Sequence, residues 1–175
     1  ILQRIGAELV DQTDAASLLS QIEQYTPLRV GNLVQRLVQL RAGFREGKAA
    51  SKVLLAGGPA IVHAGGREAL TWLIDEEFIH ILFCGNALPA HDMEVDLYGT
   101  SLGYGHVAGR VVPHGHEHHL RTINRIRALG SIEAAVRAGV IKTGIMAACI
   151  RRGAQVVMAG TIRDDGPLPG VITDS

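Results

Sequence analysis

Small and polar residues that could bind a ligand follow three short apolar runs of this sequence. The runs end at Ala56, Cys84 and Ala159, and glycine comes directly after each. The candidate ligand-binding residues after the second and third runs are Gly85, Asn86, Ala87, Asp164 and Asp165. Glycine lets a backbone approach a ligand closely, and an amide or a carboxylate can bind ribose hydroxyls or an amine. The pattern predicts a small-molecule site, with plain surface turns as the alternative.

His91 and Asp92 lie shortly after the second run and are candidates for proton handling. Glu94 and Asp96 stand close behind them. A histidine beside acids can act as a general base because its pKa is easily tuned near neutral pH. The acids could equally mark the start of a helix, where carboxylates interact favourably with the helix dipole. Spacing alone leaves both interpretations open.

A second group of histidines has the residue type that binds metal ions, but its spacing argues against a metal site. Its members are His106, His114, His116, His118 and His119. Three histidines and a water can hold catalytic zinc. The alternating spacing, however, is not the i, i+4 pair of a helical site, and neither cysteine is nearby. We therefore predict a histidine-rich loop without a resident metal ion.

The sequence lacks a convincing dinucleotide fingerprint. Residues 103–108 fit the letters G-x-G-x-x-A. The fingerprint requires a strand, a turn and a helix in that order, and the residues at 97–101 do not have the pattern of a strand. A nucleotide site in this chain would have to be built in another way.

Apolar periodicity and glycine or proline breaks predict the elements that position these residues. Helices are expected at 13–25, 26–46, 67–77, 88–97, 117–129, 131–138 and 142–152, strands at 52–56, 78–84 and 154–159, and a glycine-rich loop at 99–116. Strands that alternate with helices predict an α/β fold, a parallel sheet with crossover helices. Because residues 13–46 carry helical patterns, we expect residues 1–50 to be a helical lead-in. Three strands make a thin sheet, so we expect residues 51–175 to be part of a larger domain that is incomplete at its C-terminus.

Composition excludes several classes of protein. The chain has 175 residues, of which 47% are hydrophobic, so it can build a core. Lys and Arg number 17 and so do Asp and Glu, which argues against nucleic-acid or anionic-membrane partners. No apolar run approaches the length of a membrane span. The 2 cysteines have no partner spacing, so we expect both to be reduced, in a cytoplasmic protein.

Several long motifs in order resemble one known family. They are Gly58–Gly66 (GPAIVHAGG), Cys84–Glu94 (CGNALPAHDME), Leu97–Gly103 (LYGTSLG), His119–Asn124 (HLRTIN) and Ala159–Asp174 (AGTIRDDGPLPGVITD). Through these motifs the chain resembles the archaeal-type ornithine cyclodeaminases. The same module forms the C-terminal half of bacterial arginine dihydrolase–ornithine cyclodeaminase proteins. It is related to the lysine-ketoglutarate reductase/saccharopine dehydrogenase-associated (LOR/SDH) family.

This resemblance implies a Rossmann-like domain of the deoxyhypusine-synthase type, with bound NAD and no glycine fingerprint. It implies a lyase that converts ornithine to proline with loss of ammonia, in arginine catabolism and proline biosynthesis. By motif, Gly85, Asn86, Ala87 and one or both of Asp164 and Asp165 would contact the cofactor. His91 and Asp92 would handle protons. A homo-oligomer is also expected.

The sequence departs from the family pattern in one loop. Where the family has Gly-Gly-His-Arg-Asn-His-Leu, this chain has His114-Gly-His-Glu-His-His-Leu120, so only His116 and His119 match among the polar positions. Two other functions stay open. The chain could be a non-catalytic dinucleotide-binding or regulatory module attached to an arginine dihydrolase, or it could belong to another amino-acid dehydrogenase.

Overall fold

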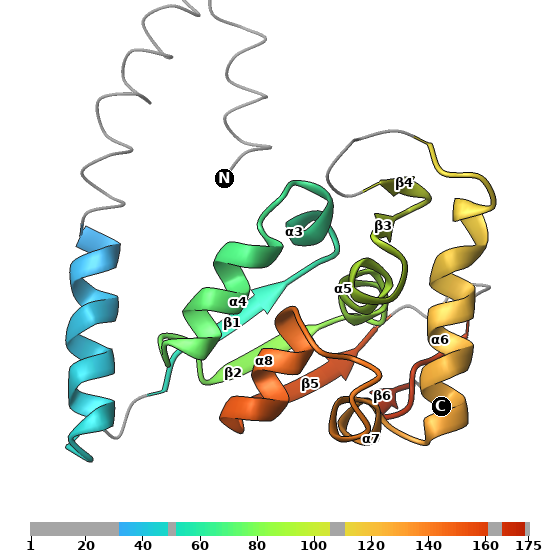
Figure 1. Ribbon diagram of the computed structural model, residues 1–175. Helices are drawn as coiled ribbons and strands as arrows, with labels where there is room; N and C mark the ends of the chain where they lie inside the picture. Colours follow the sequence, from blue (N-terminus) through green and yellow to red (C-terminus); the bar gives the residue numbers. More distant parts are fainter. Residues whose placement is uncertain (1–31, 49–51, 106–110, 161–165, 174–175) are drawn as a thin grey trace, which may run out of the picture.

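Four parallel strands form the central sheet of this protein. The structure, a computed structural model, describes residues 32–48, 52–105, 111–160 and 166–173 (Figure 1). The strands lie in the order β1-β2-β5-β6, and every neighbouring pair is parallel. Their bounds are Leu54–Gly57 (β1), Ile81–Cys84 (β2), Gln155–Ala159 (β5) and Val171–Ile172 (β6). The predicted α/β fold with a parallel sheet and crossover helices is confirmed.

Helices connect these strands. They are α3 (Ala60–His63), α4 (Arg67–Asp75), α5 (Ala87–Tyr98), α6 (His118–Leu129), α7 (Ile132–Arg137) and α8 (Ile145–Arg152), with a 3-10 turn at Gly115–Glu117. Local sequence sets their ends. Gly130 takes a φ of 87° and ends α6, and the Ser131 hydroxyl then accepts a hydrogen bond of 2.9 Å from the Ala134 amide at the start of α7. No helix in the described ranges is long and apolar enough to cross a bilayer.

The core lies between one face of the sheet and the helices α4, α5 and α8. Leu82 of β2, Ile74 of α4 and Ala148 of α8 are all fully buried there. No described residue covers the opposite face of the sheet. Phe83 is 43% exposed and Leu54 is 48% exposed on that side. Parallel sheets are usually covered on both faces, and in the described part of the chain the helices cover one face of this sheet.

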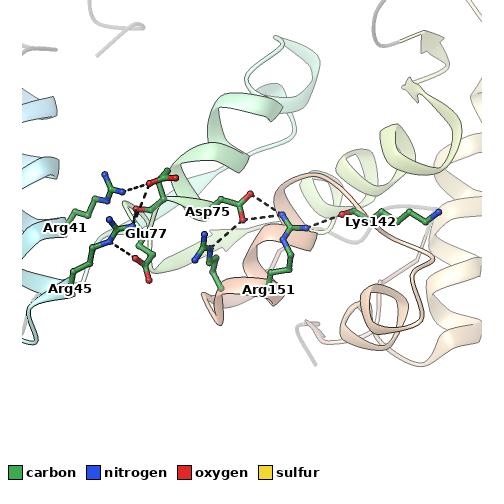
Figure 2. A network of polar contacts seen from close by, with 8 residues as sticks. Arg41, Arg45, Asp75, Glu77, Lys142 and Arg151 are labelled. Atoms are coloured by element: carbon green, nitrogen blue, oxygen red, sulfur yellow. Dashed lines mark hydrogen bonds and ion pairs between the residues drawn. The ribbon is translucent and has the colours of Figure 1, made fainter.

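A helix over residues 32–45 is held to the N-terminal side of the sheet by polar contacts. Arg41 bonds to the Glu76 carboxylate, and Arg45 Nε donates to Glu77 at 2.7 Å (Figure 2). In the same network, Arg151 of α8 donates to both oxygens of Asp75, at 3.2 and 3.1 Å. These side chains are partly exposed to solvent, so each pair contributes little alone and together they orient the helices.

The sequence prediction differs from the structure in three places. The loop expected at 99–116 contains a short antiparallel pair, β3 (Thr100–Ser101) and β4 (Tyr104–Gly105). The helix α3 and the strand β6 were not predicted, because elements of four and two residues are too short to show a period. The helix expected at 13–25 and the first residues of the one at 26–46 lie outside the described residues.

Candidate functional site

The carboxyl ends of β1, β2 and β5 border an open hollow of about 460 Å³. Its walls are apolar and mostly small: Ala56, Gly57, Phe83, Cys84, Val157 and Ala159. Ligands of open parallel sheets bind outside this edge, and the volume lies within the roughly 300–1,000 Å³ typical of small-molecule sites. Burial raises the pKa of the Cys84 thiol to about 11, so this wall is uncharged at neutral pH.

Asn86 joins two of the loops at this edge. The side chain is buried between the end of β2 and the start of α5. Its amide nitrogen donates to the Gly166 carbonyl at 3.0 Å, and its oxygen accepts from the Leu168 amide at 2.8 Å. Asn86 therefore fixes the loop after β5 to the end of β2.

Arg127 of α6 holds the same loop from its other side. Its Nε donates to the Pro167 carbonyl at 2.8 Å. A Cβ on Gly166 would come within 2.2 Å of the Arg127 guanidinium, and Gly166 also has a φ of 72°. Only glycine fits this position without a shift of the arginine. The segment that follows Asp165 is thus anchored by two side chains.

The other predicted cofactor residues divide into two groups. Gly85 follows β2 directly and Ala87 is the first residue of α5, so both lie at the edge of the sheet with Asn86. Asp164 and Asp165 lie outside the described residues.

His91 lies one turn into α5, in a buried polar cluster. Its Nδ1 is 2.8 Å from Oε2 of Glu94, whose side chain is fully buried. The other carboxylate oxygen of Glu94 accepts a hydrogen bond of 2.9 Å from the Thr100 hydroxyl. The Thr100 oxygen in turn lies 2.8 Å from Nδ1 of His118. A carboxylate thus links the histidines of two helices.

His63, at the end of α3, brings a further imidazole to this cluster. Its ring meets the His91 ring edge to face, with centroids 4.7 Å apart. Its Nδ1 is 2.7 Å from the Ser101 hydroxyl of β3. His119 of α6 lies on another side of His91, with ring centroids 6.0 Å apart. The elements α3, α5 and β3 lie on the side of the sheet toward which β1 and β2 point (Figure 1).

Two groups in the cluster have perturbed pKa values. Burial acts to raise the pKa of Glu94, but the hydrogen bonds from His91, Thr100 and the Leu102 amide outweigh it and lower the pKa below its usual value. Burial and the neighbouring His91 lower the pKa of His63, although Glu94 opposes them. At neutral pH the cluster therefore holds one buried carboxylate beside a neutral His63.

Asp92 faces a different part of the molecule. Its side chain is fully buried and accepts from Arg67 Nε at 2.8 Å. It also accepts from the backbone amides of Ile145 and Met146, at 2.9 and 2.8 Å, at the start of α8. Burial raises the pKa of Asp92, and the arginine and the two amides act against it. His91 and Asp92, adjacent in sequence, therefore serve separate networks.

The histidine-rich segment does not assemble a metal site in the described part of the chain. His114 and His116 are exposed beside Glu117, while His118 contacts the Thr100 hydroxyl and His119 lies beside the His91 ring. Among described residues, no three His, Cys, Asp or Glu side chains are placed to hold a metal ion. His106 lies outside the described residues.

Sequence reasoning missed His63, Thr100 and Ser101 and gave Glu94 no role of its own. His63 is separated from His91 by a whole helix and strand, so no local pattern relates them. Glu94 is three residues after His91, and this i, i+3 spacing was the available signal, because such residues share a helix face.

Known proteins match most of this chain. A family model described as arginine dihydrolase ArgZ-like, C-terminal, Rossmann fold, matches residues 32–175. An ornithine cyclodeaminase of Methanopyrus kandleri is 50% identical over 123 residues, which are 70% of this chain and 30% of that protein. The chain thus spans less than a third of that relative's length.

Solved structures agree with the fold. A putative LOR/SDH protein from Methanococcus maripaludis superposes with a TM-score of 0.78 at 42% identity, over 82% of this chain and 44% of that one. A ternary complex of AgrE with ornithine and NAD+ gives 0.71 at 44% identity, over 80% of this chain and 20% of that one. AgrE of Nostoc is a bifunctional arginine dihydrolase/ornithine cyclodeaminase.

Proposed function

We propose, from the premise that this chain belongs to the family of ArgZ-like C-terminal Rossmann-fold domains, that it provides the cofactor-binding part of an NAD-dependent ornithine cyclodeaminase. The reaction would convert ornithine to proline and ammonia. The observation that carries the proposal is the hollow at the carboxyl ends of three strands, in a chain that is 50% identical to an ornithine cyclodeaminase over 123 residues. The ornithine and NAD+ bound to AgrE support the choice of ligands.

The described residues fit a nicotinamide dinucleotide. The small side chains of Ala56 and Ala159 leave room for a flat ring against the sheet. Gly85 and Ala87 would allow the cofactor close to the backbone, and Asn86 would hold the neighbouring loop in place. Asp164 and Asp165 remain proposals for ribose or amine binding, because carboxylates accept two hydrogen bonds from either group.

When bound, NAD would supply a hydride acceptor for the ornithine α-carbon and later return that hydride, so the cofactor is recycled. The protein's own residues would supply the proton transfers. We assign these to His91, which is buried and bonded to a carboxylate. Asp92 is fully occupied by Arg67 and α8, so we assign it to positioning. A homo-oligomer stays a prediction from the sequence.

The cofactor proposal is tested by denaturing the full-length protein and identifying any released nucleotide, followed by a proline assay with ornithine and NAD+. The proposal expects NAD and proline production that His91→Gln reduces by about 10²-fold or more, a typical loss for a general acid or base. Turnover of a different amino acid with net reduction of NAD would instead favour the dehydrogenase. NAD binding without turnover of any amino acid would favour a regulatory module.

A further inference from the structure

Glu94 lies among the histidines of the buried cluster, and the proposed function gives this carboxylate no role. Its side chain is fully buried and contacts His91 and Thr100, each with a different oxygen. The Leu102 amide also donates to Oε2, at 3.3 Å. A buried carboxylate is costly unless all of its partners donate hydrogen bonds. Each of these groups must therefore present a proton to Glu94.

This requirement decides the direction of every hydrogen bond in the chain of contacts. Glu94 is ionised, so it only accepts, and His91 must carry its proton on Nδ1. The Thr100 hydroxyl has one proton, which it gives to Oε1 of Glu94. Its oxygen can then only accept from the next partner, so Nδ1 of His118 must also carry a proton.

We propose that Glu94 is a positioning residue that fixes the tautomer of two histidines, His91 directly and His118 through the Thr100 hydroxyl. In both neutral rings the lone pair would then lie on Nε2. A lone pair on a defined nitrogen is what a general base requires, and a carboxylate behind an imidazole is the established way to provide it. The role of Glu94 in turnover rests on the proposed function, but the tautomers do not.

The surroundings of the cluster support this assignment. The groups that face His91 from the packed elements are His63 of α3, Glu94 of its own helix and His119 of α6. Among these three, Glu94 is the acid. His118 is further held by a stacked contact with the Tyr98 ring, at 4.5 Å between centroids and 16° between planes. The His118 ring thus has a fixed plane as well as a fixed Nδ1 partner.

The test is nitrogen NMR of the full-length protein carrying labelled histidine, because imidazole nitrogen shifts distinguish the two neutral tautomers. His91 and His118 signals are assigned by their loss in His91→Gln and His118→Gln. In the unmodified protein, both rings in their neutral form should carry the proton on Nδ1. An Nε2–H form in His91 would overturn the proposal, even where no variant of Glu94 folds. An Nε2–H form in His118 would overturn the part of the proposal in which Glu94 acts on His118 through the Thr100 hydroxyl.

Two variants separate the effect of Glu94 on His91 from its effect on His118. Glu94→Gln should mix the tautomers of both rings, because an amide side chain can donate as well as accept and no longer requires a donor on Nδ1 of His91. Thr100→Val should release the tautomer of His118 alone. Glu117→Gln is the matched control, since its exposed carboxylate bonds to Arg121 and should leave both rings unchanged.

The outcomes are decisive in each direction. An unchanged tautomer of His91 in Glu94→Gln would show that the carboxylate does not set it. If Thr100→Val changed the tautomer of His91 as much as that of His118, the separate control of the two rings would be contradicted. None of these readouts needs NAD or ornithine, so an inactive protein with the expected tautomers would refute only the proposed function.

Discussion

Arg67 and Asp92 form an ion pair inside the protein, with 2.8 Å between the Arg67 Nε and the Asp92 Oδ1. Their side chains are 7% and 0% exposed. Arg67 begins α4, Asp92 lies in α5, and the same carboxylate accepts from the first amides of α8. Three helices on the covered face of the sheet therefore meet at one carboxylate.

Gly144 should be essential to this junction. A Cβ there would lie 2.1 Å from the Arg67 guanidinium and 2.3 Å from Asp92, and φ is 95°. Gly144→Ala should lower the free energy of unfolding by about 2 kcal/mol or more, through backbone strain and displacement of a buried ion pair. Chemical denaturation measures this. Gly58→Ala is the control, because its Cβ would meet open space, and equal stability of the two variants would contradict the prediction.

Stability should fall in mildly acidic solution because of His80. This residue is 8% exposed, and its Nδ1 accepts a hydrogen bond of 3.1 Å from the Val53 amide. Burial, and then the charge of Lys52, lower the pKa of His80 below its ordinary value of 6.5. The unfolded chain therefore binds a proton that the folded chain resists.

The sign of the effect follows from this difference in bound protons. The contribution of His80 to stability is complete above pH 6.5 and is lost as the pH falls below that value. Between pH 7.5 and 5, the free energy of unfolding should fall less steeply with falling pH in His80→Leu than in the unmodified protein. His80→Leu should also be the less stable of the two at every pH in this range. An identical slope in both proteins would refute the role of His80. His63, whose pKa is also lowered, supplies a residual dependence of stability on pH.

The sequence predicted the sheet because its strands are apolar runs that end in glycine. It also placed Asn86 and His91 shortly after the second strand, and in the structure α5 follows β2 directly. These inferences needed only local periodicity and the rule that parallel strands share one carboxyl edge.

The partners of those residues could not be predicted in the same way. Asn86 bonds to a loop 80 and 82 residues further along the chain, and Arg67 and Asp92 are 25 residues apart. Their contacts depend on how helices pack, which one sequence does not encode in any short pattern. Sequence proximity alone also grouped Asp92 with His91, whereas successive helical residues face different directions.

Removal of metal should leave the stability of this protein unchanged. His114 and His116 are exposed, and Glu117 beside them is paired with Arg121. A structural metal would contribute folding free energy of several kcal/mol. Thermal unfolding with and without a chelator should therefore give the same Tm. A fall of more than about 5 °C, the scale of roughly 1–2 kcal/mol for a domain of this size, would show that the segment holds a structural metal.

Asn86→Ala should weaken NAD binding while the fold survives. The variant removes the bonds to the Gly166 carbonyl and the Leu168 amide, so the loop after β5 loses its attachment to β2. Each lost bond costs about 1 kcal/mol, and the loop carries Asp165, our proposed ligand residue. Titration of NAD into the full-length protein should therefore show at least about a tenfold weaker affinity, equal to 1.4 kcal/mol.

Asn86→Asp distinguishes the anchoring role of Asn86 from a direct contact with the cofactor. The aspartate keeps an oxygen to accept from the Leu168 amide but has no donor for the Gly166 carbonyl. An anchoring role predicts an intermediate affinity for Asn86→Asp, because one of two bonds survives. A direct amide contact with NAD predicts that Asn86→Asp binds no better than Asn86→Ala, since a negative charge would face the phosphates. Unchanged affinity in Asn86→Ala would contradict both roles.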